Sequence, residues 1–151
     1  MLVYRLGTDA HPIWDGAGAA AHGGRWNLIG QPAIYAAGTL SLAMLERLVQ
    51  RRNLGRILKV RAELPDDVEI DDLMARPPAG WRALGSPEAA AAGGAWLRDG
   101  RAAVLRVPSV LVPTQANYMI NPLHHDAARI VVSETEHLDW DARLFSIPPS
   151  R

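Results

Sequence analysis

The sequence predicts an α+β protein, with a single domain over residues 1–151 that is built from short mixed strands with flanking helices. Short apolar runs that end at proline or glycine recur along the chain, as is typical of strands. Two segments, 39–53 and 86–98, change to a helical period and carry capping residues at their ends. The length of 151 residues suits one domain with its own hydrophobic core.

The strands are expected to be short and to stop at prolines. The first two cover residues 2–5 and 33–37, separated by a Gly- and Ala-rich loop over 7–24 with room for one weak helical turn. Proline cannot donate to a sheet, so it is expected at strand ends and interruptions. The other expected strands cover residues 57–64, 68–71, 103–113 (broken by Pro108), 117–122 and 129–134.

The first expected helix covers residues 39–53. Thr39 or Ser41 can cap its start, and Arg51 and Arg52 lie in its last turn. Its buried stripe is expected to contain Leu42, Leu45, Leu48 and Val49.

The second expected helix starts at Ser86-Pro87-Glu88 and runs to about Arg98, with Gly100 after it. Gly93-Gly94 in its middle costs about 1 kcal/mol per residue relative to alanine. Another segment is therefore expected to pack closely against these glycines.

Composition and charge exclude several classes of protein. Lys+Arg and Asp+Glu both number 16, so a broad basic face for nucleic acid is not indicated. The absence of cysteine excludes disulfides, thiolate zinc sites and a cysteine nucleophile. The N-terminus has no signal-peptide pattern, and no apolar run approaches the roughly 20 residues of a membrane span. A cytoplasmic protein without membrane association is expected.

The stretch GGRWNLIGQPAIY, residues 23–35, places an arginine after two glycines. Glycine permits positive φ and close approach of a ligand to the backbone. The guanidinium of Arg25 offers a planar fork of donors for phosphate or carboxylate. Arg25 is therefore either a ligand-binding residue or a loop arginine paired with a nearby acid. Arg5, in the first strand, is either an edge charge or an inward ligand group.

Glu46 and Tyr35 each have two interpretations. On a wheel of about 100° per residue, Glu46 lies about 40° beyond Leu42, at the border of the buried stripe. It is either a solvated side chain that pairs with Gln50 or an arginine, or a carboxylate in a cleft that stabilises developing positive charge. Tyr35 shares a strand face with two alanines. It is either a core tyrosine with a bonded hydroxyl or a platform for a flat ligand.

Other polar residues give weaker signals. His124 and His125 are adjacent and expected to point apart, with no metal motif around them, so no metal site is expected. Ser109 follows Pro108 without a G-x-S-x-G elbow, which favours a turn serine over a nucleophile. Asn117 and Asn121 could each cap a turn or reach a ligand.

The order of these segments resembles the RES domain, the toxin half of a bacterial toxin–antitoxin operon. The matching blocks extend from the N-terminus past residue 124, so the resemblance covers nearly the whole chain. Arg25, Glu46 and Ser109 match the three residues that name the family. The blocks are YRL (4–6), GGRWN (23–27), IYAAGTLSLAMLE (34–46), GWRAL (80–84), AVLRVPSVLVP (103–113) and NYMINPLH (117–124).

The resemblance implies a fold similar to ADP-ribosyltransferase toxins and an activity that breaks the nicotinamide–ribose bond of NAD+. The ADP-ribosyl acceptor would be water, phosphate or a protein side chain, and the partner would be an Xre-like antitoxin that covers the active site. No metal and no direct nucleic-acid contact are implied. The implied catalytic residues are Arg25, Tyr35 and Glu46, and the implied NAD contacts are Arg5, Asn27, Ser109 and Asn121.

Two other classes of function remain open at the level of sequence. A nucleic-acid or protein binding module would use Arg25 and Trp26 as a contact patch, but the neutral charge and few aromatic residues disfavour nucleic acid. A ribonuclease-type toxin would need a histidine general base, and the histidines lack suitable neighbours.

Overall fold

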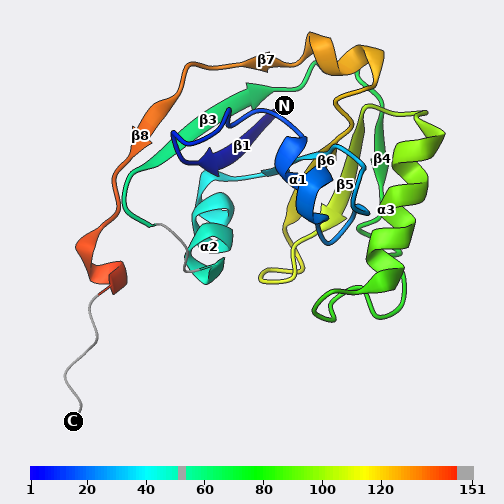
Figure 1. The fold of residues 1–151 in the computed structure, drawn as a ribbon, viewed down its shortest axis with the longest axis horizontal. Coiled ribbons are helices and arrows are strands. Elements are labelled where there is room, and N and C mark those ends of the chain that lie inside the picture. Colours follow the sequence, from blue (N-terminus) through cyan, green and yellow to red (C-terminus); the bar gives the residue numbers. More distant parts are fainter. Residues whose placement is uncertain (51–53, 146–151) are drawn as a thin grey trace.

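An eight-stranded sheet forms the centre of the computed structural model, which describes residues 1–50 and 54–145 (Figure 1). The strand order is β4-β5-β6-β2-β1-β3-β7, and β8 pairs with β3 beside β7. All described pairs are antiparallel except β4 with β5. The strands are β1 (Leu2–Gly7), β2 (Ile34–Ala37), β3 (Ile57–Glu63), β4 (Ile70–Asp72), β5 (Val104–Pro108), β6 (Ala116–Ile120), β7 (Val131–Val132) and β8 (Glu136–Leu138).

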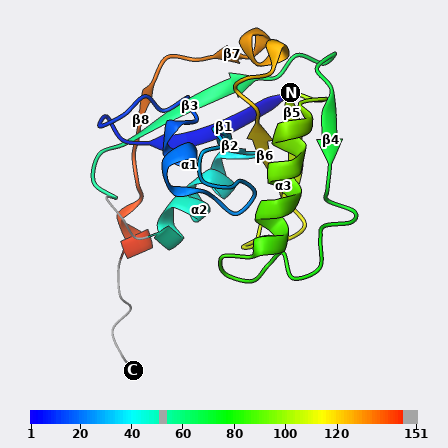
Figure 2. The ribbon, with the colours of Figure 1, turned by 45° about the vertical axis from the view of Figure 1, so that its right-hand side comes forward.

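Two helices, α2 (Leu40–Gln50) and α3 (Pro87–Asp99), cover the same face of the sheet. Leu42 of α2 packs with Ala37 of β2, and Trp96 of α3 packs with Met119 of β6. Tyr35 and Ala37 are two residues apart in β2 and therefore lie on one face of the sheet. Met119 lies on the same face because it is paired with Tyr35. We call this face the site face. Figures 1 and 2 show α2 and α3 at either side of β5 and β6, with α1 (Ala17–His22) in front of the central strands.

The opposite face of the sheet carries a second apolar core. Val3, Ala36 and Ile120 lie there, because each alternates with a residue of the site face. Trp14 and the segment around η1 (His125–Arg129) pack over this core. A last short helix, η2 (Ala142–Phe145), follows β8. The sheet is thus covered on both sides, as its strongly apolar central strands require.

The predicted α+β fold is confirmed, and most predicted elements occur near their expected positions. The predicted helix 39–53 is observed as α2, capped by Thr39, whose Oγ1 accepts a hydrogen bond from the Leu42 amide at 3.1 Å. Its expected last turn, with Arg51 and Arg52, lies outside the described residues. The strand expected over 129–134 is reduced to β7, and β8 was not predicted.

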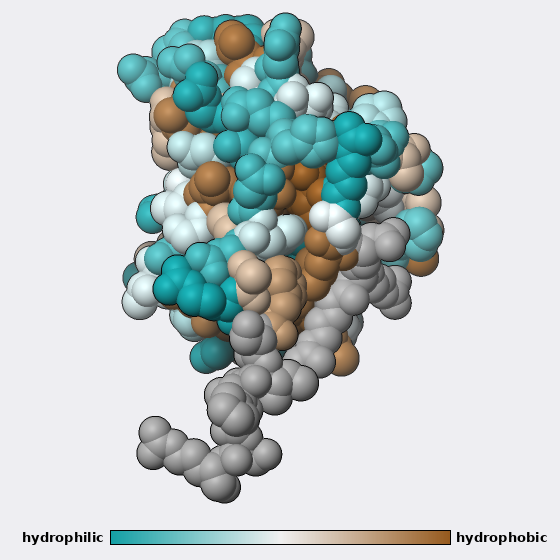
Figure 3. Space-filling view, turned by 90° about the vertical axis from the view of Figure 1, so that its left-hand side faces the viewer, coloured by the Kyte–Doolittle hydropathy of each residue, from teal (hydrophilic) through white to brown (hydrophobic). Residues whose placement is uncertain are grey.

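The predicted buried stripe of α2 is wrong at two positions. Leu45 is 38% exposed and Val49 is 57% exposed, whereas Glu46 is half-buried. The helix turns Leu42 and Ala43 toward Ala37 of the sheet, which rotates Glu46 inward. Apolar side chains therefore remain at the surface on this side, where Figure 3 shows an apolar strip among polar side chains. Exposed apolar residues of α2 and η2 are Leu45, Val49, Leu144 and Phe145.

The close packing expected at Gly93-Gly94 is confirmed. A Cβ at Gly93 would overlap the carbonyl group of Trp26, and Gly94 leaves room for the side chains of Leu28 and Gln31. The Gln31 amide donates to the Gly94 carbonyl at 3.0 Å. The two glycines therefore let α3 dock onto residues 26–31, directly after Arg25.

Within residues 1–50 and 54–145, no helix is long and apolar enough to cross a bilayer.

Candidate active site

Glu46 lies at the centre of a polar group on the site face. Its Oε1 atom accepts one hydrogen bond from the Ser109 hydroxyl and one from the Asn117 amide, both at 2.9 Å. No described residue forms an ion pair with Glu46. The expected pairing of Glu46 with Gln50 is not observed, and Arg51, the arginine five residues on, lies outside the described residues. Helix α2 instead directs the carboxylate toward the ends of β5 and β6.

Ser109 is fully buried, and its hydroxyl has a fixed orientation. The oxygen accepts hydrogen bonds from the amides of Leu111 and Val112 at 3.1 and 3.2 Å. A serine hydroxyl has two acceptor lone pairs and one proton, so the proton points at Glu46. Ser109 is thus both the turn serine that the sequence favoured and a direct partner of the carboxylate.

Asn117 also belongs to this group, although the resemblance implied Asn121 and not Asn117 as an NAD contact. It lies opposite Ala37 of β2, immediately before the connection to α2, and therefore beside Glu46. Asn121 lies past the other end of β6, where its Oδ1 accepts from the Leu123 amide at 3.0 Å. Strand alternation alone places both asparagines on one face, so only the pairing of β6 with β2 distinguishes them.

Tyr35 of β2 lies diagonally opposite Asn117 of β6, on the same face of the sheet. Its hydroxyl donates to Asn27 Oδ1 at 2.7 Å and accepts from the Trp26 amide at 3.1 Å. Burial raises the pKa of Tyr35 far above its ordinary value, partly opposed by the Trp26 amide and the charges of Arg25 and Arg5. The phenol is therefore neutral and fully bonded, and it is not a general base at neutral pH.

Arg25 holds the loop that precedes α3. Its Nη1 donates to the carbonyl groups of Trp81 and Ala83, both at 2.7 Å. The neighbouring Trp26 ring stacks on Trp81 with centroids 6.0 Å apart. The alternative of a loop arginine paired with an acid is not observed, because carbonyl oxygens take the place of a carboxylate. Arg25 is half-buried beside the Tyr35 hydroxyl, so its cationic fork lies next to the site face.

The glycine pair before Arg25 serves the protein's own packing. Gly23 has φ +70°, a conformation that favours glycine. A Cβ at Gly24 would lie 2.8 Å from the Tyr35 hydroxyl and 2.7 Å from Asn27 Oδ1. Gly24 therefore allows the backbone to approach Tyr35, where the sequence led us to expect the approach of a ligand.

The remaining predicted NAD contacts use polar atoms within the chain. Asn27 is buried and its amide donates to the carbonyl groups of Ala19, Leu28 and Gln31 at 2.9–3.0 Å. The guanidinium of Arg5 donates from Nε to the Ile13 carbonyl at 2.5 Å and from Nη1 to the Tyr35 carbonyl at 2.7 Å. Burial lowers the pKa of Arg5, an effect opposed by the charge of Asp15.

Arg5 and Asn121 are thus not brought into contact with Glu46. Arg5 alternates with Tyr4 and Leu6, which pack toward α2, so it leaves β1 on the side away from that helix. The roles of Arg5, Asn27 and Asn121 in NAD binding stay predictions.

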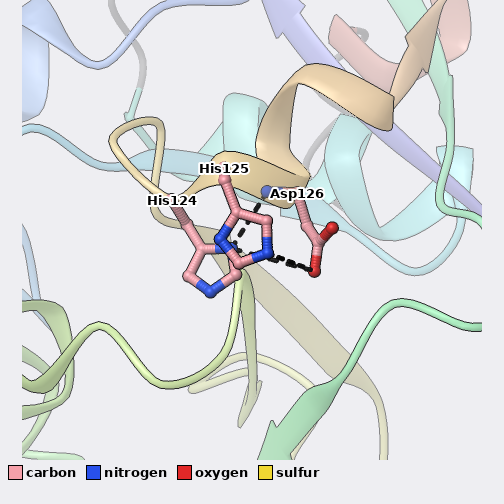
Figure 4. Close-up of side chains that lie close together, drawn as sticks. All are labelled: His124, His125 and Asp126. Atoms are coloured by element: carbon pink, nitrogen blue, oxygen red, sulfur yellow. Dashed lines mark hydrogen bonds and ion pairs between the residues drawn. The ribbon is translucent and has the colours of Figure 1, made fainter.

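His124, His125 and Asp126 form a compact group at the start of η1 (Figure 4). The expectation that the two adjacent rings point apart is wrong, because they stack with centroids 4.3 Å apart. His124 Nδ1 accepts a hydrogen bond from the Asp126 amide at 3.1 Å, and the Asp126 carboxylate pairs with Arg129 at 3.1 Å. The absence of a metal site stays a prediction.

Two cavities in the described structure lie away from Glu46. One of about 230 Å³ separates β4 from α3 near Asp71 and Trp96. Another of about 190 Å³ lies by Tyr4 and Lys59. Neither is lined by Arg25, Tyr35 or Glu46.

Comparison with known proteins identifies the family. The RES domain family matches residues 2–141. A protein of Sphingobium sp. (strain YBL2), named Prs ADP-ribosylating toxin, is 37% identical over 93% of this chain and 94% of its own length. The Toxin Res proteins of Yersinia enterocolitica and Photorhabdus laumondii are 36% and 33% identical, over 82% and 95% of this chain and 86% and 97% of their own lengths.

A solved structure supports the same fold. One chain of the crystal structure of the Mycobacterium tuberculosis MbcT–MbcA toxin–antitoxin complex matches with a TM-score of 0.71 and 19% sequence identity, over 91% of this chain and 83% of that chain. This chain therefore belongs to the RES domain family.

Proposed function

We propose that this chain breaks the nicotinamide–ribose bond of NAD+ and that Glu46 stabilises the ribosyl cation formed in this step. The observation that carries the proposal is a half-buried carboxylate that, among residues 1–50 and 54–145, is held only by the neutral donors of Ser109 and Asn117. A cationic partner would cancel its charge before substrate arrived. Held in this way, the carboxylate remains a preorganised negative charge for a developing cation.

The reaction requires little covalent chemistry from the protein. The electron pair of the glycosidic bond leaves with nicotinamide, and the ribose becomes an oxocarbenium-like cation, as in glycoside cleavage. A nucleophile then forms a bond to the same ribose carbon and loses its proton. Glu46 supports the first step, because the positive charge appears only as nicotinamide departs.

Tyr35 and Arg25 would bind the two ends of the reacting part of NAD+. The hydroxyl of Tyr35 is occupied by Asn27 and Trp26, which leaves its ring face as the ligand platform. Arg25 would bind phosphate or ribose oxygens through its fork. Because Nη1 now donates to the Trp81 and Ala83 carbonyls, ligand binding and movement of loop 80–84 would be coupled.

The acceptor and the partner form the finer part of the proposal. The name of the Sphingobium relative states that it ADP-ribosylates Prs, so we propose a protein side chain as acceptor here, with water and phosphate as competitors. The similar solved chain belongs to a toxin–antitoxin complex. We propose an Xre-like antitoxin that covers the site face near Arg25 and Glu46.

Nicotinamide release by the purified protein tests this function. We expect wild type to release nicotinamide from NAD+, and Glu46→Gln to retain the fold while its turnover falls by on the order of 10²–10³. Glu63→Gln, an exposed glutamate of β3, is the matched control and should match wild type. Wild-type turnover in Glu46→Gln would refute the role of Glu46. Absence of nicotinamide release in every variant would favour the binding-module or ribonuclease alternatives.

A further inference from the structure

The two oxygens of the Glu46 carboxylate have different surroundings. Oε1 accepts both hydrogen bonds of the group, from Ser109 and from Asn117, at 2.9 Å each. Among residues 1–50 and 54–145, no hydrogen bond or ion pair is described for Oε2. Within the described part of the chain, the carboxylate is therefore held through Oε1, and Oε2 has no partner there.

The chemistry of both partners fixes the direction of these two hydrogen bonds. The hydroxyl of Ser109 has its acceptor sites occupied by the Leu111 and Val112 amides, so it can only donate to Glu46. The Nδ2 of Asn117 has no acceptor capacity. Both partners thus require a lone pair on Oε1, and neither can accept a proton from it.

The two partners also come from elements that fix their positions independently. Asn117 lies in a central strand, where its backbone is paired with Ala37 on one side and Val107 on the other. Ser109 directly follows β5, and its amide donates to the Gln115 carbonyl at 3.0 Å. The carboxylate is therefore held by two donors that the sheet and the turn after β5 keep in place.

We infer that Asn117 is a positioning residue for the reaction: with Ser109 it fixes Oε1 of Glu46 and leaves Oε2 to face the ribose of NAD+. The inference rests on the proposed role of Glu46 and adds a residue and an atom to it. Asn117 acts through Glu46 and does not touch the substrate. Misplacement of a reacting group by about 1 Å costs up to about 100-fold in rate, so loss of this contact should be measurable.

The first test is the kinetics of Asn117→Leu, which keeps the size of the side chain and removes the donor. We expect kcat for nicotinamide release to fall by on the order of 10- to 100-fold, with the KM for NAD+ within about twofold of wild type. Tyr118→Phe, the next residue of β6 on the opposite face, is the control for general disturbance of the strand. An increased KM with unchanged kcat would overturn the inference, because it would indicate direct substrate binding.

The second test asks whether Asn117 acts through Glu46. In the Glu46→Gln background, Asn117→Leu should cause no further loss of turnover, since the charge that it positions is already absent. An equal fold-loss in both backgrounds would overturn the inference and indicate a structural role. Thermal melting of each variant confirms that it is folded.

Ser109 provides the complementary variant. Ser109→Ala together with Asn117→Leu should approach the turnover of Glu46→Gln, because both donors to Oε1 are then lost. Ser133→Ala, a turn serine whose hydroxyl accepts from the Arg61 amide at 3.1 Å, is the matched control. If Glu46→Gln loses activity while Asn117→Leu behaves as wild type, the positioning role fails and the proposed function stands. If Glu46→Gln itself is fully active, the proposed role of Glu46 fails as well.

Discussion

At the scale of single residues, Tyr35 combines an observed structural role with a proposed role in NAD+ binding. Its hydroxyl is bonded to Asn27 and to the Trp26 amide, which ties β2 to the loop that carries Arg25. The two interpretations left open by the sequence are therefore compatible. The hydroxyl belongs to the protein's own hydrogen-bond network, and only the ring is left for a ligand.

The raised pKa of Tyr35 predicts a loss of stability at alkaline pH. The folded state keeps the proton to higher pH than the unfolded state, whose tyrosine ionises near pH 10. The stabilisation is thus complete below about pH 10 and declines as the pH rises above it. The free energy of unfolding of Tyr35→Phe at pH 7 should be about 1–2 kcal/mol lower than that of wild type, because the Trp26 amide and Asn27 lose their hydrogen-bond partner.

Denaturant unfolding of wild type and Tyr35→Phe between pH 7 and pH 11 measures both effects. The difference between the two proteins should narrow above pH 10, because only wild type has this phenol to ionise. Tyr4→Phe, in the adjacent strand, controls for tyrosine ionisation elsewhere. A difference that stays constant across the whole range would contradict the prediction.

At the scale of elements, Arg25 connects the loop after α1 with loop 80–84 before α3. Both carbonyl acceptors lie in loop 80–84, and the stacked Trp26 and Trp81 rings reinforce the contact. A ligand that binds Arg25 through its phosphate would compete with these carbonyl groups. If Arg25 binds NAD+ as proposed, release of loop 80–84 would accompany binding.

Replacement of Arg25 should free this loop and weaken NAD+ binding together. In Arg25→Ala we expect faster amide hydrogen exchange over residues 80–84, and in the Glu46→Gln background a loss of NAD+ affinity of about 10- to 100-fold by calorimetry. Arg25→Lys should restore affinity only in part, because a point charge lacks the fork. Faster exchange with unchanged affinity would assign Arg25 a structural role only.

The docking of α3 depends on the absence of a side chain at Gly93. Gly93→Ala would place a methyl group into the Trp26 carbonyl, so we expect a loss of several kcal/mol or failure to fold. Gly18→Ala in α1 is the matched control, since a Cβ there meets nothing within 4 Å, and it should stabilise the protein by about 0.4–1 kcal/mol. Equal melting temperatures of the two variants would contradict this account.

Local patterns in the sequence predicted most elements, because caps, prolines and periodicity act over a few residues. The Ser86 cap, the Gly100 end of α3 and the close contact at Gly93 are examples. The rotation of α2 could not be predicted in this way. Whether Leu45 or Glu46 turns inward depends on Ala37 and on the donors at the ends of β5 and β6, which are distant in sequence.

The candidate site was predictable in part for the same reason. Glu46 and Ser109 could be named from the resemblance, but their direct hydrogen bond needs the fold. Asn117 could not be preferred to Asn121, since strand pairing decides which of the two meets Glu46. Arg25 was singled out for its chemistry, yet its carbonyl partners lie in a segment more than 50 residues away, as Trp81 shows.

At the scale of the whole molecule, the acceptor of the ADP-ribosyl group remains to be identified by experiment. Labelled NAD+ in a cell lysate with wild-type protein should yield a discrete labelled protein band, and Glu46→Gln should yield none. Transfer to a protein requires a nucleophile held about 3–3.5 Å from the ribose carbon. Label found only in small molecules would eliminate protein transfer and leave water or phosphate as acceptor.

In the described part of the chain Glu46 accepts hydrogen bonds from neutral donors and has no ion pair, which has a consequence for inhibition. A small molecule that has the shape of the ribose ring and carries an ammonium charge would resemble the oxocarbenium-like transition state more closely than NAD+ does. Transition-state analogues of this kind bind far more tightly than substrates. If Glu46 acts as proposed, positively charged iminosugars should inhibit this protein, and their advantage over uncharged counterparts should vanish in Glu46→Gln.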